Sequence, residues 1–168
     1  KDEGTAHIYT TSELDKLIEK LDRSPEVLRE ARRAAFEAAA PRLKAVLDRK
    51  IVSTIGDSRG KVRSWQDQFV GSKGGYAAVR PKRDAFTEPT PGGHTYAVGY
   101  VTNAINSGHR YPGQGVRKTA KAGKTDTFTY GRVEGRYFYE YAQPSVEAIA
   151  RETAQQVVDG LVKFMEDG

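Results

Sequence analysis

Apolar residues recur at steps of three and four along Ser24–Ile55, and polar residues fall largely between them. These apolar positions are Val27, Leu28, Ala31, Ala35, Ala38, Ala39, Leu43, Val46, Leu47, Ile51 and Ile55. The spacing predicts one long amphipathic helix that buries a single face. The Ser-Pro-Glu sequence at its beginning is typical of a helix start, and Gly56 is typical of a helix stop. Pro41 removes one backbone hydrogen bond, so we expect a kink there.

Two further stretches have helical spacing. Ser12–Leu21 carries leucines and an isoleucine at helical steps and predicts a short first helix. Residues 136–165 predict a second long helix, with Pro144 as a kink or a new start. The expected inward positions of this last helix are Ile149, Thr153, Ala154, Val157, Leu161, Phe164 and Met165.

The middle of the chain alternates apolar and polar residues instead. Tyr76–Val79, Tyr96–Tyr100 and Thr127–Val133 have the alternation of strands, whereas Val62–Val70 favours a short helix or a turn. Helices at both ends and strands between them indicate an α+β protein. We therefore expect two long kinked amphipathic helices packed on a small, mostly antiparallel sheet.

The segment 111–126 contains glycine, lysine and threonine but hardly any large apolar residue, so we expect it to be a long mobile loop. With the preceding arginine it is the most basic local segment, holding Arg110, Arg117, Lys118, Lys121 and Lys124 against Asp126. The whole chain carries a formal charge of +5. This excess permits an acidic partner, whether nucleic acid, an anionic surface or another protein. Residues 1–168 are expected to form a single domain with a loose segment at 1–11.

The composition of the chain excludes several kinds of functional site. The chain has no cysteine, which excludes disulfides, thiolate nucleophiles and cysteine-bound zinc. Its apolar runs are too short to cross a bilayer and its start does not resemble a signal peptide, so we expect a soluble protein without a membrane partner. His7, His94 and His109 lack metal-ligand spacing. No residue stands out as a general acid or base, and we expect neither an enzyme nor a cofactor.

Residues 56–60 match the G-x-S-x-G motif, in which a strained turn between a strand and a helix exposes a nucleophilic serine. Here the motif follows a predicted helix, so a helix-ending turn is the favoured interpretation. A hydrolase that uses Ser58 is the weakest alternative. Neither Gly60-Lys61 nor Gly123-Lys124-Thr125 has the spacing of a phosphate-binding loop.

Four aromatic residues begin the last predicted helix: Tyr137, Phe138, Tyr139 and Tyr141. On a helix Tyr137 and Tyr141 share a face, while the other two point elsewhere. One face cannot bury all four, so at least one should be exposed or should meet a partner. The alternative is that they cap the core around the helix start, because tyrosine tolerates half burial.

The order of these parts resembles the neck and tail-completion proteins of long-tailed bacteriophages, which are head–tail joining or minor tail proteins. The resemblance rests on Tyr96-Ala-Val-Gly-Tyr-Val-Thr-Asn-Ala-Ile-Asn-Ser-Gly-His-Arg110, on the glycine and lysine loop after it, and on Gly135-Arg136-Tyr137-Phe138-Tyr139 at the start of the last helix. It covers residues 12–165. Asn106 and Ser107 differ from the glutamate and the aromatic or small residue that the family often has before the glycine.

This resemblance implies a non-enzymatic virion protein that waits in the host cytoplasm and then joins a ring, commonly sixfold, at the top of the tail tube. Its partners would be further copies of itself, the tail tube protein and the neck or connector proteins. The expected assembly contacts are Arg110, Arg117, Lys118, Lys121, Lys124, Tyr137, Tyr139 and Tyr141. The alternative is a DNA-binding accessory protein whose basic loop contacts phosphates nonspecifically.

Overall fold

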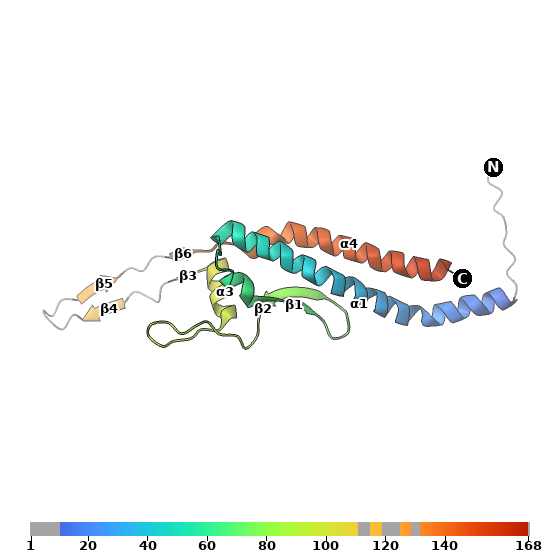
Figure 1. The fold of residues 1–168 in the computed structure, drawn as a ribbon, viewed down its shortest axis with the longest axis horizontal. Helices are drawn as coiled ribbons and strands as arrows, with labels where there is room; N and C mark the ends of the chain where they lie inside the picture. The colour runs from blue at the N-terminus through green and yellow to red at the C-terminus, as the bar shows by residue number, and fades with distance from the viewer. Residues whose placement is uncertain (1–10, 111–114, 119–124, 129–131, 168) are drawn as a thin grey trace.

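A computed structural model describes residues 11–110, 115–118, 125–128 and 132–167. Two long helices, α1 (Thr11–Ile55) and α4 (Phe138–Glu166), lie side by side in opposite directions (Figure 1). The remaining elements are α2 (Lys61–Trp65), β1 (Gln66–Val70), β2 (Ala77–Pro81), α3 (Val98–Ser107), β3 (Gly108–Arg110), β4 (Gly115–Lys118), β5 (Thr125–Phe128) and β6 (Arg132–Glu134). The predicted α+β class is confirmed.

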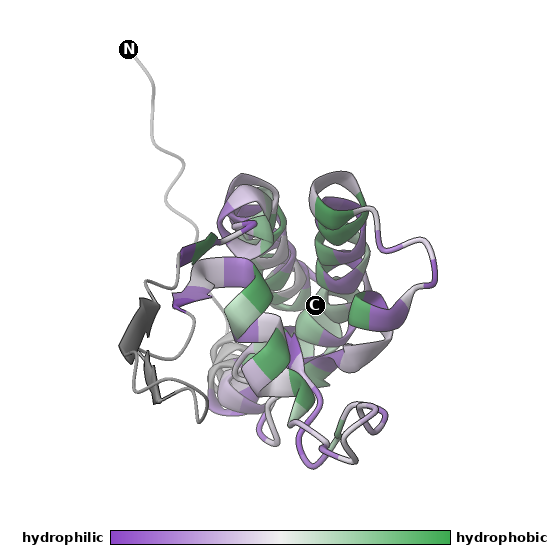
Figure 2. Ribbon diagram, turned by 90° about the vertical axis from the view of Figure 1, so that its left-hand side faces the viewer, coloured by the Kyte–Doolittle hydropathy of each residue, from purple (hydrophilic) through white to green (hydrophobic). Residues whose placement is uncertain are grey.

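The core lies mainly between α1 and α4. Its buried apolar residues are Ala39, Val46, Leu47 and Ile51 of α1, Val62 of α2, and Phe138, Ala142 and Ile149 of α4. Figure 2 looks along the long axis and shows hydrophobic and hydrophilic positions around the helices, as amphipathic helices require. Ala38 and Ala154 were predicted to face inward but are exposed, so the predicted stripes were slightly too wide. No helix among the described residues is long and apolar enough to cross a membrane.

The first helix is longer than predicted. The expected helices Ser12–Leu21 and Ser24–Ile55 belong to the single helix α1, which contains both Pro25 and Pro41. The predicted helix start at Ser24 is therefore wrong. Figure 1 shows α1 changing direction in its N-terminal third, the part that contains Pro25 and lacks one backbone hydrogen bond there. A kink at Pro41 stays a prediction.

Contacts to the end of α4 hold the N-terminal third of α1. The Lys20 ammonium donates a hydrogen bond to the carbonyl oxygen of Met165 at 3.4 Å. The Arg23 guanidinium lies 6.0 Å from the centre of the Phe164 ring. These contacts hold the part of α1 that precedes Pro25 against the end of α4. Local sequence signals could not reveal these contacts, because the residues that make them lie far apart in the chain.

The β1/β2 hairpin packs on α1. Residues 62–70, predicted as a short helix or turn, contain the end of α2 and then the whole of β1, so the strand was missed. The antiparallel register runs from Gln66 opposite Pro81 to Val70 opposite Ala77. Gly74 in the hairpin loop has a φ of 63°, and a Cβ there would lie 2.7 Å from the Cβ of Arg33. A glycine is therefore required for the loop to approach α1 this closely.

The prediction of a strand at Tyr96–Tyr100 is wrong, because α3 begins at Val98. Five alternating residues were too short a window to distinguish the two periods. Val98, Thr102 and Asn106 are buried at successive steps of four, which is the helical period. The alternating residues Tyr96–Tyr100 therefore include the first residues of an amphipathic helix. Ala97, directly before this helix, forms an isolated antiparallel β-bridge with Phe86.

Two antiparallel ladders lie in the segment between α3 and α4. Strand β3 pairs with β6, and β4 pairs with β5. We call residues 108–134, which contain these four strands, the arm. Figure 1 shows the described strands of the arm extending away from the helices. The predicted strand Thr127–Val133 falls instead on the end of β5 and the start of β6. The predicted loop at 111–126 contains β4, and its residues 111–114 and 119–124 lie outside the described part.

The G-x-S-x-G motif forms the turn between α1 and α2, as the helix-ending interpretation predicted. The Asp57 carboxylate accepts hydrogen bonds from the backbone amides of Val62 (3.1 Å) and Arg63 (3.0 Å) and from Arg63 Nε (3.2 Å). Burial by itself would raise the pKa of this carboxyl. The hydrogen bonds and the nearby guanidinium outweigh burial and leave the pKa below its ordinary value. Asp57 is thus a structural anchor for α2, and Ser58 is exposed.

We expect Asp57→Asn to destabilise the fold by about 1–3 kcal/mol at pH 7, because the charged hydrogen bonds to Arg63 are lost. Asparagine tolerates the positive φ of 29° at this position. A carboxyl with a lowered folded pKa stabilises the fold above its unfolded pKa and loses that contribution as pH falls through the folded pKa. Urea unfolding should therefore show a smaller difference between wild type and variant at pH 3 than at pH 7. An equal difference at both values would contradict this role.

Candidate assembly interface

The arm begins and ends at a junction where α3 meets α4. The carbonyl oxygens of Ile105 and Asn106 accept hydrogen bonds from the backbone amides of Arg136 (3.0 Å) and Tyr137 (2.9 Å). The side chain of Asn106 accepts from the Tyr139 amide at 3.0 Å. Its amide group donates to the Glu140 carboxylate at 3.1 and 3.2 Å. Asn106 therefore satisfies free amides at the start of α4 and fixes that start beside the end of α3.

Two glycines let the strands of the arm meet at this junction. A Cβ on Gly108 would collide with the Val133 carbonyl oxygen and lie 2.7 Å from the Gly135 nitrogen. A Cβ on Gly135 would in turn collide with the Asn106 carbonyl oxygen. Gly108 also has a φ of 77°, a conformation that favours glycine. At the base of the arm the backbone around Gly108 therefore lies in close contact with the backbone around Gly135. This contact fixes the point at which the arm leaves the helices.

A buried polar network supports the junction from below. Gln66 donates to the Thr102 hydroxyl at 3.2 Å and accepts from the Tyr139 hydroxyl at 2.7 Å. Gln66 and Thr102 are both almost fully buried. Burial raises the pKa of Tyr139 to about 12, so this hydroxyl remains a neutral donor. The network joins β1, α3 and α4 at one point.

We expect Tyr139→Phe to cost about 1–3 kcal/mol, because the side-chain oxygen of Gln66 loses its donor in a buried site. A tyrosine with a raised folded pKa contributes stability that is fully present below its unfolded pKa, near 10, and is lost as pH rises toward the folded value. Thermal unfolding from pH 8 to 11 should show a steeper alkaline loss in wild type than in the variant. Parallel curves would show that Tyr139 does not titrate in this way.

Two arginines face each other at the base of the arm. In the β3/β6 register Arg110 lies directly opposite Arg132, and both side chains are exposed. Like charges at opposite positions of an antiparallel pair are destabilising. Neither arginine forms an ion pair with a carboxylate whose side chain the structure describes. The arrangement would be relieved by an anionic group from another molecule.

The predicted contact residues divide between the arm and the start of α4. Arg110 lies in β3, and β4 holds Arg117 and Lys118 opposite Asp126 and Thr125 of β5. Lys121 and Lys124 lie outside the described residues. At the helix, Tyr137 and Tyr141 are exposed and Phe138 is completely buried. Tyr139 is half-buried and its hydroxyl is directed to Gln66, so it supports the junction from within.

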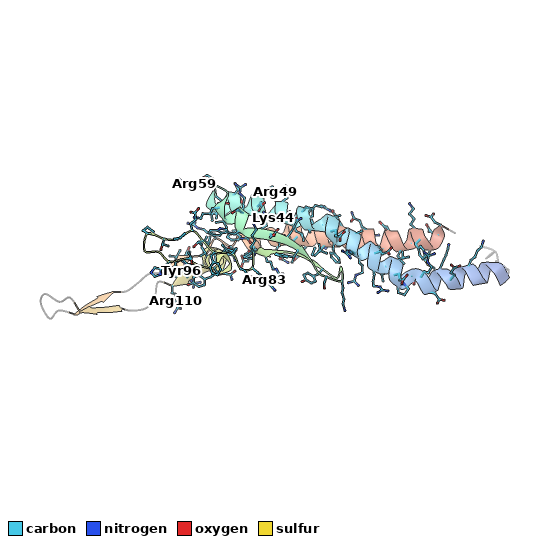
Figure 3. All side chains as sticks on the ribbon, turned by 60° about the horizontal axis from the view of Figure 1, so that its bottom comes forward. Lys44, Arg49, Arg59, Arg83, Tyr96 and Arg110 are labelled. Carbon is cyan, nitrogen blue, oxygen red and sulfur yellow. The ribbon has the colours of Figure 1, made fainter. Side chains whose placement is uncertain are left out.

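Sequence reasoning missed a second group of exposed aromatic residues. Phe86, Tyr96 and Tyr100 have side chains that are 63%, 45% and 68% exposed. The Phe86–Ala97 bridge, with the Thr87 amide donating to the Tyr96 carbonyl at 2.8 Å, holds the loop before α3 in place. Figure 3 shows Tyr96 and Arg110 at the end of the body from which the arm leaves. The wrong strand prediction covered Tyr96 and Tyr100 and did not indicate that both side chains are exposed.

The exposed side chains near the base of the arm can bind groups of another molecule. Among the residues that the structure describes, no three histidine, aspartate or glutamate side chains gather as metal ligands would. The exposed groups at the arm end include guanidinium and phenol groups, a phenyl ring and the carboxylate of Glu134. These suit binding to carboxylates or phosphates and to apolar surface of a macromolecule. We call the exposed residues Phe86, Tyr96, Tyr100, Arg110, Arg132, Tyr137 and Tyr141 the arm-end surface.

Comparisons of this chain with protein-family models, with curated proteins and with solved structures found no match.

Proposed function

We propose that this chain is a structural subunit of a tailed bacteriophage neck, a tail-completion or head–tail joining protein that assembles as a ring, commonly sixfold, on the tail tube. One observation carries this proposal. The arm leaves the body between α3 and α4, and its ladders join β3 to β6 and β4 to β5, without a strand of the body. A protein that functions alone gains little from such an extension, whereas a ring subunit can use it to reach a neighbour.

The exposed residues of the arm-end surface support the same proposal. Large exposed aromatic side chains and arginines are enriched where proteins bind one another. Tyr100 and Tyr141, at 68% and 56% exposed, belong to two different elements, α3 and α4. The junction network holds these elements rigidly, so the aromatic groups are presented in a fixed arrangement. Binding then requires little further ordering of the body.

The proposed function is tested by quantitative mass spectrometry of purified tailed particles from the source strain, with this chain counted against the tail tube protein. A number of copies near that of one ring per particle is the expected result. Absence of the chain from washed particles would contradict a structural role in the virion. Loosely attached protein is distinguished by repeating the count after a high-salt wash.

The second candidate function is a DNA-binding accessory protein. The opposed Arg110 and Arg132 favour it, because phosphates would neutralise both guanidinium groups. Binding of a 20-base-pair duplex, measured between 50 and 200 mM salt, should then weaken steeply as counterions compete. Binding that is undetectable at low salt would exclude this candidate.

A further inference from the structure

We infer that the free edge of β2 binds an extended, uncharged peptide segment of another protein as an additional strand. Aliphatic side chains of this segment lie in the groove between β2 and α4. The groove and the edge share no residue with the arm-end surface, so this binding site goes beyond the proposed function. Binding of the segment can be measured on a single chain, whether or not that chain assembles.

A groove of about 250 Å³ lies between β2 and α4, which both pack against α1. Leu43 and Leu47 of α1 line it together with Ala142 and Val146 of α4. On the third side, the consecutive residues Ala77–Val79 of β2 all line it. Successive side chains of a strand point to opposite faces, so three consecutive residues reach one groove where it follows the edge of the strand. The edge of β2 therefore faces the groove.

The ladder between β1 and β2 has hydrogen-bonded pairs at both of its ends. At the hairpin loop the Gly71 amide donates to the Tyr76 carbonyl oxygen at 2.9 Å. At the other end the Lys82 amide donates to the Trp65 carbonyl oxygen at 2.8 Å. Hydrogen-bonded and non-hydrogen-bonded pairs alternate along an antiparallel ladder. Counting from either end through the register gives the same assignment for every residue of β2.

Two residues of β2 therefore leave their backbone groups unpaired. Ala78 and Arg80 direct their amides and carbonyls to β1, whereas those of Ala77 and Val79 point away from it. No hydrogen bond between described residues uses the backbone of Ala77 or Val79, and β1 is the only described strand that pairs with β2. Unpaired donors and acceptors along an edge are a template for a further strand. An extended peptide satisfies them and places alternate side chains in the groove.

The chemistry of the groove favours an uncharged segment. The polar side chains that line it are Tyr139, whose hydroxyl belongs to the junction network, and Gln143. Charges of both signs lie beside it. Gln143 donates to the Glu147 carboxylate at 3.3 Å, and a Cβ on Gly75, two residues before β2, would lie 3.7 Å from the Arg32 guanidinium. A charged side chain in the groove would therefore lose water without gaining a counter-ion among the lining residues.

The probe is the peptide acetyl-Ser-Thr-Val-Thr-Val-Thr-Ser-amide, which has two valines on one side of an extended chain. Its binding to the full chain is measured by fluorescence anisotropy after labelling. The control peptide has the same side chains and carries N-methyl groups on both valines and on the threonine between them. N-methylation removes the donors that pair with an edge, so we expect its affinity to be lower by about tenfold or more.

Amide hydrogen exchange, followed by nuclear magnetic resonance, locates the bound peptide. In the free chain the amides of Ala78 and Arg80 should exchange slowly and those of Ala77 and Val79 faster. At a peptide concentration of about ten times the Kd, exchange at Ala77 and Val79 should slow by about tenfold, because only the unbound fraction exchanges. The amides of Ala78 and Arg80 serve as internal controls, since they already pair with β1.

Two variants test the edge and the groove separately. Ala77→Pro removes an amide on the free edge and keeps the ladder with β1, because proline is tolerated where an edge N–H is unpaired. Val146→Trp fills the groove from α4. Each should weaken peptide binding by about fivefold or more. Val158→Trp is the matched control, since Val158 is 53% exposed on the same helix and does not line the groove.

Circular dichroism and thermal unfolding check that every variant is folded, and the two tryptophan variants decide the outcome if Ala77→Pro does not fold. Wild type that does not bind the peptide at millimolar concentration would overturn the inference. Equally tight binding of the N-methylated peptide would replace strand addition by apolar contact alone. Binding that Val146→Trp leaves unchanged, or that Val158→Trp weakens equally, would place the peptide outside the groove. None of these results changes the count of copies per particle, which tests the proposed function independently.

Discussion

Replacing residues 111–131 by Asn-Gly should leave a folded protein that no longer assembles. The replacement joins Arg110 directly to Arg132 through a two-residue hairpin turn, which suits their opposite positions in the register. The core cluster consists of residues of α1, α2 and α4, and neither β3 nor β6, the strands that remain, contributes to it. We therefore expect thermal unfolding within a few degrees of wild type, while size-exclusion chromatography and electron microscopy show loss of rings.

The matched control keeps the arm and alters another exposed segment. Residues 89–93 form a loop whose side chains are mostly exposed, and Thr90 and Gly93 are joined by a backbone hydrogen bond at its turn. Replacing Pro89 and Pro91 by alanine changes this loop without touching the arm and should leave assembly unaltered. If the chain without its arm still forms rings in the same yield, the arm is not the assembly element and the proposed function loses its main support.

Phe138→Ala should destabilise the protein by about 3–5 kcal/mol, because it empties a fully buried site at the start of α4. Phe138 belongs to the core cluster with Ile51 and Val62, and its ring lies 4.9 Å from that of Tyr139. A typical domain has a net stability of about 5–15 kcal/mol, so a large part of the fold's stability depends on this side chain. Urea unfolding at pH 7 measures the loss directly.

Tyr141→Ala is the control, since it removes another aromatic ring one turn later on the same helix. Tyr141 is 56% exposed, so we expect a change of less than about 0.5 kcal/mol. The two substitutions should also differ in assembly, because Tyr141 belongs to the arm-end surface and Phe138 does not. Equal destabilisation by both substitutions would contradict the assignment of Phe138 to the core and of Tyr141 to the surface.

The spacing of apolar residues predicted the helices that bury a continuous apolar stripe over several turns. The last helix was predicted at residues 136–165 and is found at Phe138–Glu166, because Ile149 and Thr153 recur on one side over many turns. Short elements were less predictable. At Tyr96–Tyr100 five alternating residues fitted a strand equally well, and burial of Thr102 and Asn106 decided for a helix. A helix period becomes distinct from a strand period only over a longer window.

The candidate surface was predictable in part. The abundance of basic residues in the arm and the exposure of Tyr137 or Tyr141 followed from residue type and helical spacing alone. The opposition of Arg110 and Arg132 did not, because it depends on how residues 22 positions apart are paired in a ladder. The exposure of Phe86 was likewise hidden, since an isolated aromatic residue in a loop is equally compatible with burial.

The sequence by itself determined the α+β class, the two long amphipathic helices, the glycine turn after α1 and the basic character of the arm, because each depends on neighbours within a few turns of chain. The tertiary structure decided that α1 continues through Pro25, where contacts from Lys20 and Arg23 to the end of α4 span the proline. It also decided that Asn106 fixes the start of α4 and that Tyr139 is directed inward. These features arise from pairings between distant residues, whose free energy exists only once the chain has folded.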